Sequence, residues 1–422
     1  MSEKYLGIDF GTTGARATVI DKSANIVCNV QNTFTNIPSD RLAQVWQSTL
    51  ENLIRQIPIE VREQLQAIAI IGTSSSVLLC DAQGYPITEP LLYNDSRGQC
   101  VLEQIKSIAP QNHVVISATS SLAKLLWWQQ QSYFGQAHYL LHQADWLAFW
   151  LHGKLGVSDY HNALKLGYDV EQLCYPNWLQ QLDCNNLLPE ILAPGTLVKA
   201  ITSTQSLKFD IPPNCIIKTG TTDSIAAFLA SGATQPGEAV TSLGSTIVLK
   251  LLSKMRVTAS NYGIYSHRLG NLWLIGGASN TGGAVLKHFF TDQDLERLSA
   301  KINSSVSSPL DYYPLLQPGD RFPINNPHLS PKLEPRPQDP TEFLHGLLES
   351  MARIENAGYQ KLQKLSGVNL KCVYTAGGGA KNQTWKKIRQ RRLGVSVKVA
   401  TNTQAAYGTA LLASGKLSYT KK

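Results

Sequence analysis

Three short turns rich in glycine and threonine carry the side chains that could do chemistry. The first lies in Gly7–Arg16, which reads GIDFGTTGAR. Such a turn exposes backbone N–H groups and hydroxyls that suit phosphate oxygens. Asp9 precedes the turn inside an apolar strand, where a carboxylate is costly unless it meets a cation, and magnesium on a nucleotide is the natural candidate. The alternative is an ordinary hairpin turn with Asp9 bonded to backbone.

The second turn lies in Cys215–Phe228, where an apolar strand runs into Gly220-Thr-Thr and Asp223 then opens an apolar helix. Asp223 could simply cap that helix. The functional alternative is a carboxylate fixed at the mouth of a phosphate site, placed to accept a hydroxyl proton during phosphoryl transfer. These residues alone leave both interpretations open.

The third turn follows a strand that begins at Cys372 and contains three consecutive glycines, in CVYTAGGGAKN. Consecutive glycines permit close approach by a flat ligand such as adenine or ribose. The pattern is not G-x-G-x-x-G, because Asn382 takes the place of the last glycine, and no G-x-x-x-x-G-K-[ST] occurs. Rossmann dinucleotide binding and a Walker-type loop are therefore disfavoured.

The segments around these turns alternate between strand and helix patterns. Residues 4–10 and 15–20 predict a hairpin around the first turn. Ser39 and Asp40 are expected to open a helix with apolar residues every three or four positions, which Pro58 ends. Residues 67–71 are wholly apolar, as in a strand that is buried on both faces. The fold class is therefore α/β.

A weak internal repeat predicts the domain organisation. Residues 238–252 place Gly244-Ser-Thr246 between two apolar runs, as Gly11-Thr-Thr13 lies in the first hairpin. This predicts two related α/β domains. A long excursion rich in Ser, Pro, Asn and Asp is expected on the second domain at 303–340. The domains are assigned to 1–228 and 229–402, and a C-terminal helix in 403–422 is expected to return to the first.

Composition narrows the class of protein. The chain has 422 residues, of which 43% are hydrophobic and 16% charged, and no apolar run approaches the roughly 18 residues that cross a bilayer. Its N-terminus enters a strand pattern without a signal-peptide pattern, which predicts a cytoplasmic protein. Seven scattered cysteines without a C-x-x-C pair predict reduced thiols, and nine histidines at no zinc-ligand spacing argue against a protein-caged transition metal.

The net charge of +8 is compatible with nucleic acid, an anionic membrane or small polyanions. The one dense basic run, Lys386–Arg392, includes Ile388 and precedes Leu393, so it is interpreted as the solvated face of a helix that lies on a core. We expect no nucleic-acid or membrane partner. Four tryptophans at helical spacing are interpreted as core rather than a sugar platform: Trp127, Trp128, Trp146 and Trp150.

In order, the three turns resemble the first phosphate, second phosphate and adenosine motifs of the FGGY carbohydrate kinases, which belong to the actin/hexokinase/Hsp70 ATPase superfamily. Four further stretches are similar to family motifs and extend the resemblance over essentially the whole chain. Tyr93–Arg97 is similar to W-x-D-x-R, and residues 145–153 are similar to a helix that ends in Leu-Thr-Gly. Residues 158–163 are similar to T-D-x-x-x-A, and residues 188–195 are similar to L-P-x-V-x-x-P-G. Tyr93 in place of tryptophan, the segment around Ser74 and the short length depart from well-known members. The short build most resembles the cyanobacterial and plant group of xylulose-kinase-like proteins, which look like D-ribulose kinases.

The resemblance implies two actin-like (ribonuclease H-like) domains with a cleft between them, and ATP and Mg²⁺ as cofactors. It implies D-ribulose as the acceptor, with D-xylulose or another polyol as the alternative, and a monomer or homodimer. Asp9 and Asp223 would be catalytic and near the metal. The ATP-binding residues would be Gly11, Thr12, Thr13, Arg16, Gly244, Ser245, Thr246, Gly377, Gly378, Gly379 and Asn382. The sugar-binding residues would be Asp9, Ser74, Asp95, Arg97 and Asp223.

Two alternatives from other classes remain at this point. One keeps the ATPase and drops the sugar, as in the chaperones and filament proteins of the superfamily, but the chain lacks the length for a peptide-binding extension. The other is a sugar or nucleotide sensor with degraded catalysis. Asp9, Thr12 and Asp223 are all present, so the sequence gives no sign of such decay.

Overall fold

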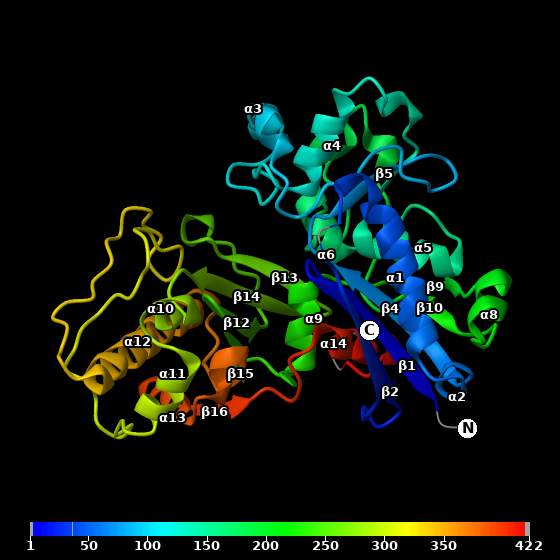
Figure 1. Cartoon of the computed structure of the whole chain (residues 1–422). Helices are drawn as coiled ribbons and strands as arrows, with labels where there is room; N and C mark the ends of the chain where they lie inside the picture. The colour runs from blue at the N-terminus through cyan, green and yellow to red at the C-terminus, as the bar shows by residue number, and fades with distance from the viewer. Residues whose placement is uncertain (1–2, 36, 418–422) are drawn as a thin grey trace. The chain divides into compact units, whose positions relative to one another are not determined.

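The computed structural model describes residues 3–35 and 37–417, which form two compact units. The first unit comprises Met1–Ala230 with Gln404–Lys422, and the second comprises Ser231–Thr403. Each is built on a six-stranded sheet (Figure 1). No helix among the described residues is long and apolar enough to span a membrane.

The sheet of the first unit combines an antiparallel meander with parallel strands. Its order is β3-β2-β1-β4-β10-β9, in which β1 pairs antiparallel with β2 and parallel with β4. The predicted hairpin around the first turn is confirmed. The strand bounds are β1 Lys4–Phe10, β2 Gly14–Asp21, β3 Ile26–Thr33, β4 Leu65–Gly72, β9 Leu197–Ala200 and β10 Ile216–Lys218.

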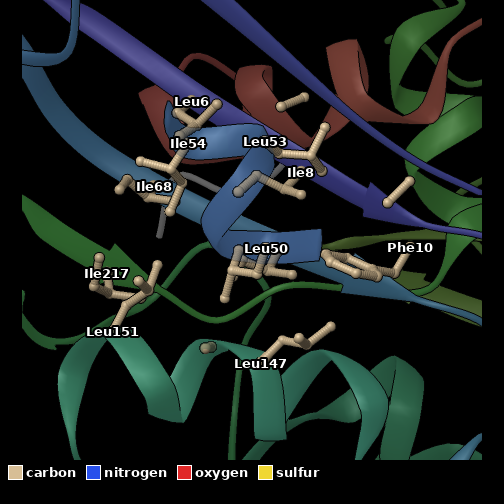
Figure 2. Packing of buried hydrophobic residues seen from close by; sticks show 14 of the residues in the cluster. Leu6, Ile8, Phe10, Leu50, Leu53, Ile54, Ile68, Leu147, Leu151 and Ile217 are labelled. Atoms are coloured by element: carbon tan, nitrogen blue, oxygen red, sulfur yellow. The ribbon is translucent and has the colours of Figure 1, made fainter. Parts of the chain in front are cut away.

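Strand β4 is covered on both faces, as its apolar run predicts. Ile68 and Ile70 pack in the large core with α1 (Leu42–Gln56) and α5 (Gln143–His152), as Figure 2 shows in part. Ala67 and Ala69 point to the opposite face, against α14 (Ala405–Ser414). Successive strand residues face opposite layers, so a strand between two helical layers is apolar throughout.

Helix α14 lies unusually close to its neighbours. A Cβ built on Gly7 of β1 would lie 2.1 Å from the Ala410 backbone nitrogen, and one built on Gly408 would lie 1.9 Å from the Ala226 carbonyl oxygen of α9 (Asp223–Ala230). Only glycine fits at either position. The small residues of α14 thus allow it to pack directly on β1 and α9.

Helix α1 begins three residues later than predicted. Ser39–Arg41 forms a single 3₁₀ turn, and α1 starts at Leu42 without a side-chain cap. The Ser39 side chain bonds to Glu89 instead of capping the helix. Pro58 follows the helix as predicted and precedes the short α2 (Ile59–Arg62).

The rest of the first unit forms a second layer of helices and short strands around its own core. Trp128 and Trp146 are buried, as predicted, whereas Trp127 and Trp150 are half-buried. The elements of this layer are β5 Val77–Cys80, α3 Leu102–Ile108, α4 Ser121–Gln129, β6 Tyr139–His142, β7 Val157–Asp159, α6 Tyr160–Ala163, the 3₁₀ turn η4 Leu164–Leu166, α7 Asn177–Gln180 and β8 Glu190–Leu192. Helix α8 (Ser203–Phe209) instead packs Phe209 into the large core.

The second unit has a sheet of related topology. Its order is β13-β14-β12-β11-β15-β16, so the hairpin β11–β12 and the parallel strand β15 match β1–β2 and β4 of the first sheet. The predicted repeat is confirmed. Between Ser299 and Pro340 the described chain contains isolated bridges but no helix or strand, where the excursion was expected. The bounds are β11 Glu238–Leu243, β12 Ile247–Ser253, β13 Tyr265–Leu269, β14 Leu272–Ser279, α10 Gly283–Phe289, α11 Asp292–Ser299, α12 Pro340–Ser366, β15 Cys372–Ala376, α13 Gln383–Leu393 and β16 Ser396–Val399.

The basic run on α13 corrects one prediction. Ile388 is buried as expected, but Arg389 is buried too and donates two hydrogen bonds of 2.6 and 2.7 Å to Glu355 of α12. Arg391 and Arg392 both bond to a second buried carboxylate. The interpretation as a solvated face is therefore wrong for Arg389, which Glu355 binds in the interior, whereas Arg391 and Arg392 are half-buried and bind Glu349 of the same helix. All seven cysteines are free thiols, as predicted.

Candidate active site

The carboxyl ends of the parallel strands β1, β4 and β10 bring two carboxylates to one edge of the first sheet. Asp9 of β1 is in register with Ile71 of β4. Beyond β10, Thr222 forms a parallel bridge with Gly72, and Asp223 then begins α9. The carboxyl ends of parallel strands are where α/β folds bind ligands. The two aspartates predicted as catalytic thus share one edge.

Asp9 has an unsatisfied carboxylate. Its Oδ1 is buried and receives no hydrogen bond from any described residue. Burial, and to a smaller extent the charge of Asp223, raise the pKa of Asp9 to about 7, although Arg16, directly opposite on β2, acts to lower it. The buried Thr222 hydroxyl likewise lacks a partner among the described residues. Buried polar atoms normally find partners, so this edge is shaped for a ligand that supplies them.

Asp223 stands on a turn that the rest of the unit holds firmly. Its Oδ1 accepts from the Ser224 backbone N–H at 2.6 Å. Gly220 presses on β4 so closely that a Cβ there would lie 1.8 Å from the Ile70 carbonyl oxygen. Thr221 Oγ1 is 2.7 Å from His161 Nδ1 of α6. Contacts on both sides therefore fix the turn, and with it the carboxylate.

Helix α6 is anchored by a buried acid of its own. Asp159 is fully buried and accepts from the His161 and Asn162 backbone N–H groups and from the Asn162 amide at 2.6 Å. Burial raises the pKa of Asp159 to about 7, and Asp145 adds to the effect. This cap holds the helix whose His161 contacts the Asp223 turn.

The tip of the first turn remains open to solvent. Thr12 and Thr13 are exposed, as is Arg16. The turn closes through a hydrogen bond from Gly11 N–H to the Gly14 carbonyl at 3.0 Å. The hydroxyls of both threonines therefore point to no buried partner and can meet phosphate oxygens.

Lys124 of α4 joins the two segments that contain the predicted sugar-binding residues, and the sequence analysis did not single it out. It is fully buried, and its Nζ donates to the carbonyls of Ser75 at 2.7 Å and Leu92 at 2.5 Å. Ser75 has a left-handed backbone, with φ of 69°. The Tyr93 N–H also donates to Ser76 Oγ at 3.0 Å. The sequence does contain one indication that Lys124 is buried, because it lies within the otherwise largely apolar run SLAKLLWW.

Two predicted sugar-binding residues pair with each other. Arg97 donates to Asp95 at 2.9 Å, bonds to Glu89 at 2.7 Å and lies 5.1 Å from the centre of the Trp127 ring. Burial alone would raise the pKa of Asp95, but the bonds from Arg97 outweigh it and the pKa is lowered. Ser74 is half-buried and directly precedes Ser75, whose carbonyl accepts from Lys124. The charges of this pair are thus already balanced by protein groups.

In the second unit, three glycine-rich turns pack on one another. Gly377 has φ of 84°, and a Cβ there would lie 2.6 Å from the Leu243 carbonyl oxygen, next to Gly244. The Gly283 N–H donates to the Gly244 carbonyl at 2.8 Å. Gly378 faces open space. The turn at 281–283 was missed, although it has the same signal of small residues between a strand and a helix.

Asn382 closes the third turn through its side chain. Its amide oxygen accepts from the Trp385 N–H at 2.9 Å, and its Nδ2 donates to Ser299 Oγ at 2.8 Å. Asn382 is thus the N-cap of α13, with its amide engaged inside the unit. The structure brings the predicted site residues together in two groups. One lies in the first unit with Asp9 and Asp223, and the other lies in the second with Gly244–Thr246, Gly377–Gly379 and Asn382.

Two family models together match nearly the whole chain. The N-terminal domain of the FGGY family of carbohydrate kinases matches residues 4–230, and the C-terminal domain of the same family matches residues 239–416. The chain belongs to the FGGY family of carbohydrate kinases. It is an ATP-dependent sugar kinase with the two-domain α/β fold of that family, which confirms the predicted reaction class and fold.

Relatives of this FGGY kinase carry several names. It is 22% identical over 438 residues to a xylulose kinase of Staphylococcus xylosus, covering 97% of this chain and 90% of that one. An autoinducer-2 kinase of Yersinia enterocolitica is 24% identical over 457 residues, covering 97% and 85%. A solved gluconate kinase from Lactobacillus acidophilus has a TM-score of 0.84 at 17% identity, covering 100% and 91%. Plasmodium falciparum glycerol kinase with ADP has a TM-score of 0.83 at 16% identity, covering 100% and 91%.

The residues of this FGGY kinase fit a magnesium ion that arrives with a nucleotide. Among the described residues no group of three or more His, Cys, Asp or Glu side chains could hold a metal. Asp9 nevertheless offers a buried carboxylate oxygen without a partner, beside Asp223. Mg²⁺ prefers oxygen ligands and is often bound by one or two carboxylates together with substrate phosphates. This donor set matches that mode and not a protein cage.

Proposed function

We propose that this kinase phosphorylates a small ketose, D-ribulose, at its 5-hydroxyl, with ATP as the donor and D-ribulose 5-phosphate and ADP as products. The observation that carries the reaction is the pair Asp9 and Asp223 at the carboxyl edge of the first sheet, with a carboxylate oxygen that no described residue satisfies. The choice of D-ribulose rests on the short build and on Tyr93–Arg97, which resemble the cyanobacterial and plant group.

Asp223 is the proposed general base. Its carboxylate would orient the acceptor hydroxyl and take its proton as the new O–P bond forms and the bond between the γ-phosphorus and the β–γ bridging oxygen breaks. The fixed turn supports this role, since Gly220 and His161 hold it from two sides. A positioned base needs little reorganisation during the reaction.

Asp9 is the proposed partner of magnesium, either directly or through water. When bound, Mg²⁺ would neutralise charge on the transferred phosphoryl group. The unsatisfied Oδ1 and the raised pKa of Asp9 support this role, because a nearby cation favours the ionised carboxylate.

The nucleotide would be held by backbone groups of the glycine turns. We assign phosphate contacts to Gly11–Thr13 with Arg16 and to Gly244–Thr246, and adenosine contacts to Gly377–Gly379. The open space at Gly378 supports close approach of a flat ligand there. Asn382 would contribute by closing the turn, since its amide is already engaged.

D-xylulose is the second candidate acceptor. Xylulose kinases recur among the relatives, including that of Staphylococcus xylosus, and cover nearly the whole chain. D-ribulose and D-xylulose differ only at C3, so the choice between them depends on hydroxyl contacts in the acceptor site. A site built to hydrogen-bond a hydroxyl discriminates strongly against analogues that lack or misplace it.

The test is a coupled assay of ADP release over D-ribulose, D-xylulose, glycerol and gluconate, with ³¹P and ¹³C NMR of the product. The proposal expects the highest kcat/KM for D-ribulose and phosphorylation at O5. A higher kcat/KM for another sugar overturns the acceptor assignment and leaves the kinase assignment intact.

A further inference from the structure

A second lysine of the first unit, Lys165, is half-buried. It lies in the 3₁₀ turn η4, and no described residue forms a hydrogen bond or an ion pair within 4.0 Å with its ammonium. Burial lowers the pKa of Lys165, and only the charge of Asp223 opposes that effect. An ammonium that no protein group accepts from keeps its three donors available to a ligand.

The surroundings of Lys165 place it beside the acceptor groups. Its turn follows α6 directly, and α6 is tied to the Asp223 turn through the 2.7 Å contact between His161 and Thr221. The 3₁₀ turn η4 also packs against α4, the helix that carries Lys124. The 3₁₀ turn that carries Lys165 therefore contacts both the helix tied to the turn of the proposed base and the helix whose lysine holds the two sugar-site segments.

Electrostatic interactions connect the proposed catalytic pair to the predicted sugar-binding pair. Asp9 interacts with Arg16 on one side and Asp223 on the other. Asp223 interacts with Lys165, and Lys165 with Lys124. Lys124 in turn interacts with Asp95, which Arg97 binds. These interactions thus form a continuous series from the proposed catalytic pair to the predicted sugar-binding pair, and the two lysines supply its middle.

We propose that Lys165 is an acceptor-binding residue whose ammonium donates to a hydroxyl or carbonyl oxygen of the sugar, next to the hydroxyl that Asp223 deprotonates. The proposal rests on the proposed function and adds to it a residue that contacts the substrate. A lysine ammonium offers three donors, and sugar oxygens are their natural acceptors. Lys124 differs from Lys165 because its ammonium already donates to two backbone carbonyls. Lys124 therefore positions the two sugar-site segments, whereas the ammonium of Lys165 can donate to the ligand.

The variant Lys165→Met tests the proposal, because methionine keeps the unbranched stem and removes the charge. The acceptor is whichever sugar the wild-type enzyme turns over fastest. We expect its KM to rise about 10- to 100-fold, the effect of losing a hydrogen bond to a charged group. The KM for ATP should change less than about twofold, and the melting temperature should stay nearly the same, because the ammonium makes no hydrogen bond within the protein that the variant could lose.

Lys218→Met is the matched control. Lys218 of β10 is also half-buried with a pKa lowered by burial, but its ammonium lies near Gly415 beyond the end of α14. This variant should leave both KM values unchanged. Lys165→Arg, which keeps the charge, should recover part of the lost acceptor affinity.

Two results would overturn the proposal. An unchanged acceptor KM in Lys165→Met shows that the ammonium does not bind the sugar. A lowered melting temperature together with equal losses for sugar and ATP shows a structural role. If the wild-type enzyme does not phosphorylate D-ribulose but does phosphorylate another sugar, the acceptor assignment is refuted and Lys165 is tested with that other sugar. If the wild-type enzyme phosphorylates no sugar, the proposed function and the role of Lys165 are both refuted.

Discussion

The two units differ in whether the charges near the proposed sites are paired. In the first unit, no described residue forms a hydrogen bond with Asp9 Oδ1 or with the ammonium of the half-buried Lys165. In the second unit, Glu355 and Arg389 satisfy each other with two short hydrogen bonds. The proposed nucleotide turns of the second unit thus offer glycine backbone, whereas the proposed acceptor site of the first unit offers side chains with hydrogen-bonding capacity left open. We therefore expect the rate of phosphoryl transfer to depend on side chains of the first unit. The stability of the glycine-rich turns in the second unit should depend on its buried ion pairs.

The largest expected effect is on the rate and comes from the first unit. Asp223→Asn keeps the size of the side chain but cannot accept the proton, so kcat should fall about 10²- to 10⁴-fold. Urea unfolding should show little change. Asp292→Asn is the matched control, because Asp292 is also the first residue of a helix. If Asp223 only favours the helix start, both variants will lose similar small amounts of stability and neither will lose activity.

The next effect is on stability and comes from the second unit. Arg389→Met leaves the buried carboxylate of Glu355 without its cation, which should lower the free energy of unfolding by about 3–5 kcal/mol. The double variant Arg389→Met/Glu355→Leu should recover much of that loss, since an apolar pair replaces the stranded charge. Chemical denaturation of the three proteins measures this. A loss below about 1 kcal/mol in the single variant would contradict the contrast between the units.

Asp9→Asn should stabilise the nucleotide-free and metal-free protein, and the gain should depend on pH. Asp9 has a pKa of about 7 when folded and about 4 when unfolded, so the folded state binds an extra proton between these values. Its stability therefore falls as pH rises from about 4 to 7 and stays reduced above 7. The asparagine variant avoids this and should be about 1–3 kcal/mol more stable at pH 8, with the difference shrinking toward pH 5. Thermal unfolding across this range checks the sign, and a constant difference would refute the assigned pKa.

The smallest effect separates two neighbouring glycines. Gly378→Ala meets no protein atom and should change the free energy of unfolding by less than about 0.5 kcal/mol while weakening ADP binding. Gly377→Ala places a Cβ against the Leu243 carbonyl at a φ of 84° and should cost more than about 1 kcal/mol. Calorimetry with ADP and denaturation of both variants test this pair. Unchanged ADP affinity in Gly378→Ala would remove that residue from the adenosine site.

Local pattern predicted most of the elements that carry the site. The hairpins and the buried strand β4 could be identified because their signals lie within a few residues, as alternation, apolar runs and small-residue turns. The partners of charged residues could not. Arg389 pairs with Glu355 across 34 positions of sequence, and nothing near either residue indicates the other. For the same reason Lys124 and Lys165 were missed, since their significance depends on segments that only the fold brings together.

The place of α14 sets an order of assembly during synthesis. This helix lies against Gly7 and Ala226, yet it follows every residue of the second unit in the chain. A ribosome therefore makes the whole second unit before it makes the layer that covers β1 and the Ala67–Ala69 face of β4. Until then the face of β1 that carries Tyr5 and Gly7 is open to water. The second unit can complete its core as soon as it emerges, while the first unit, although begun first, is finished last.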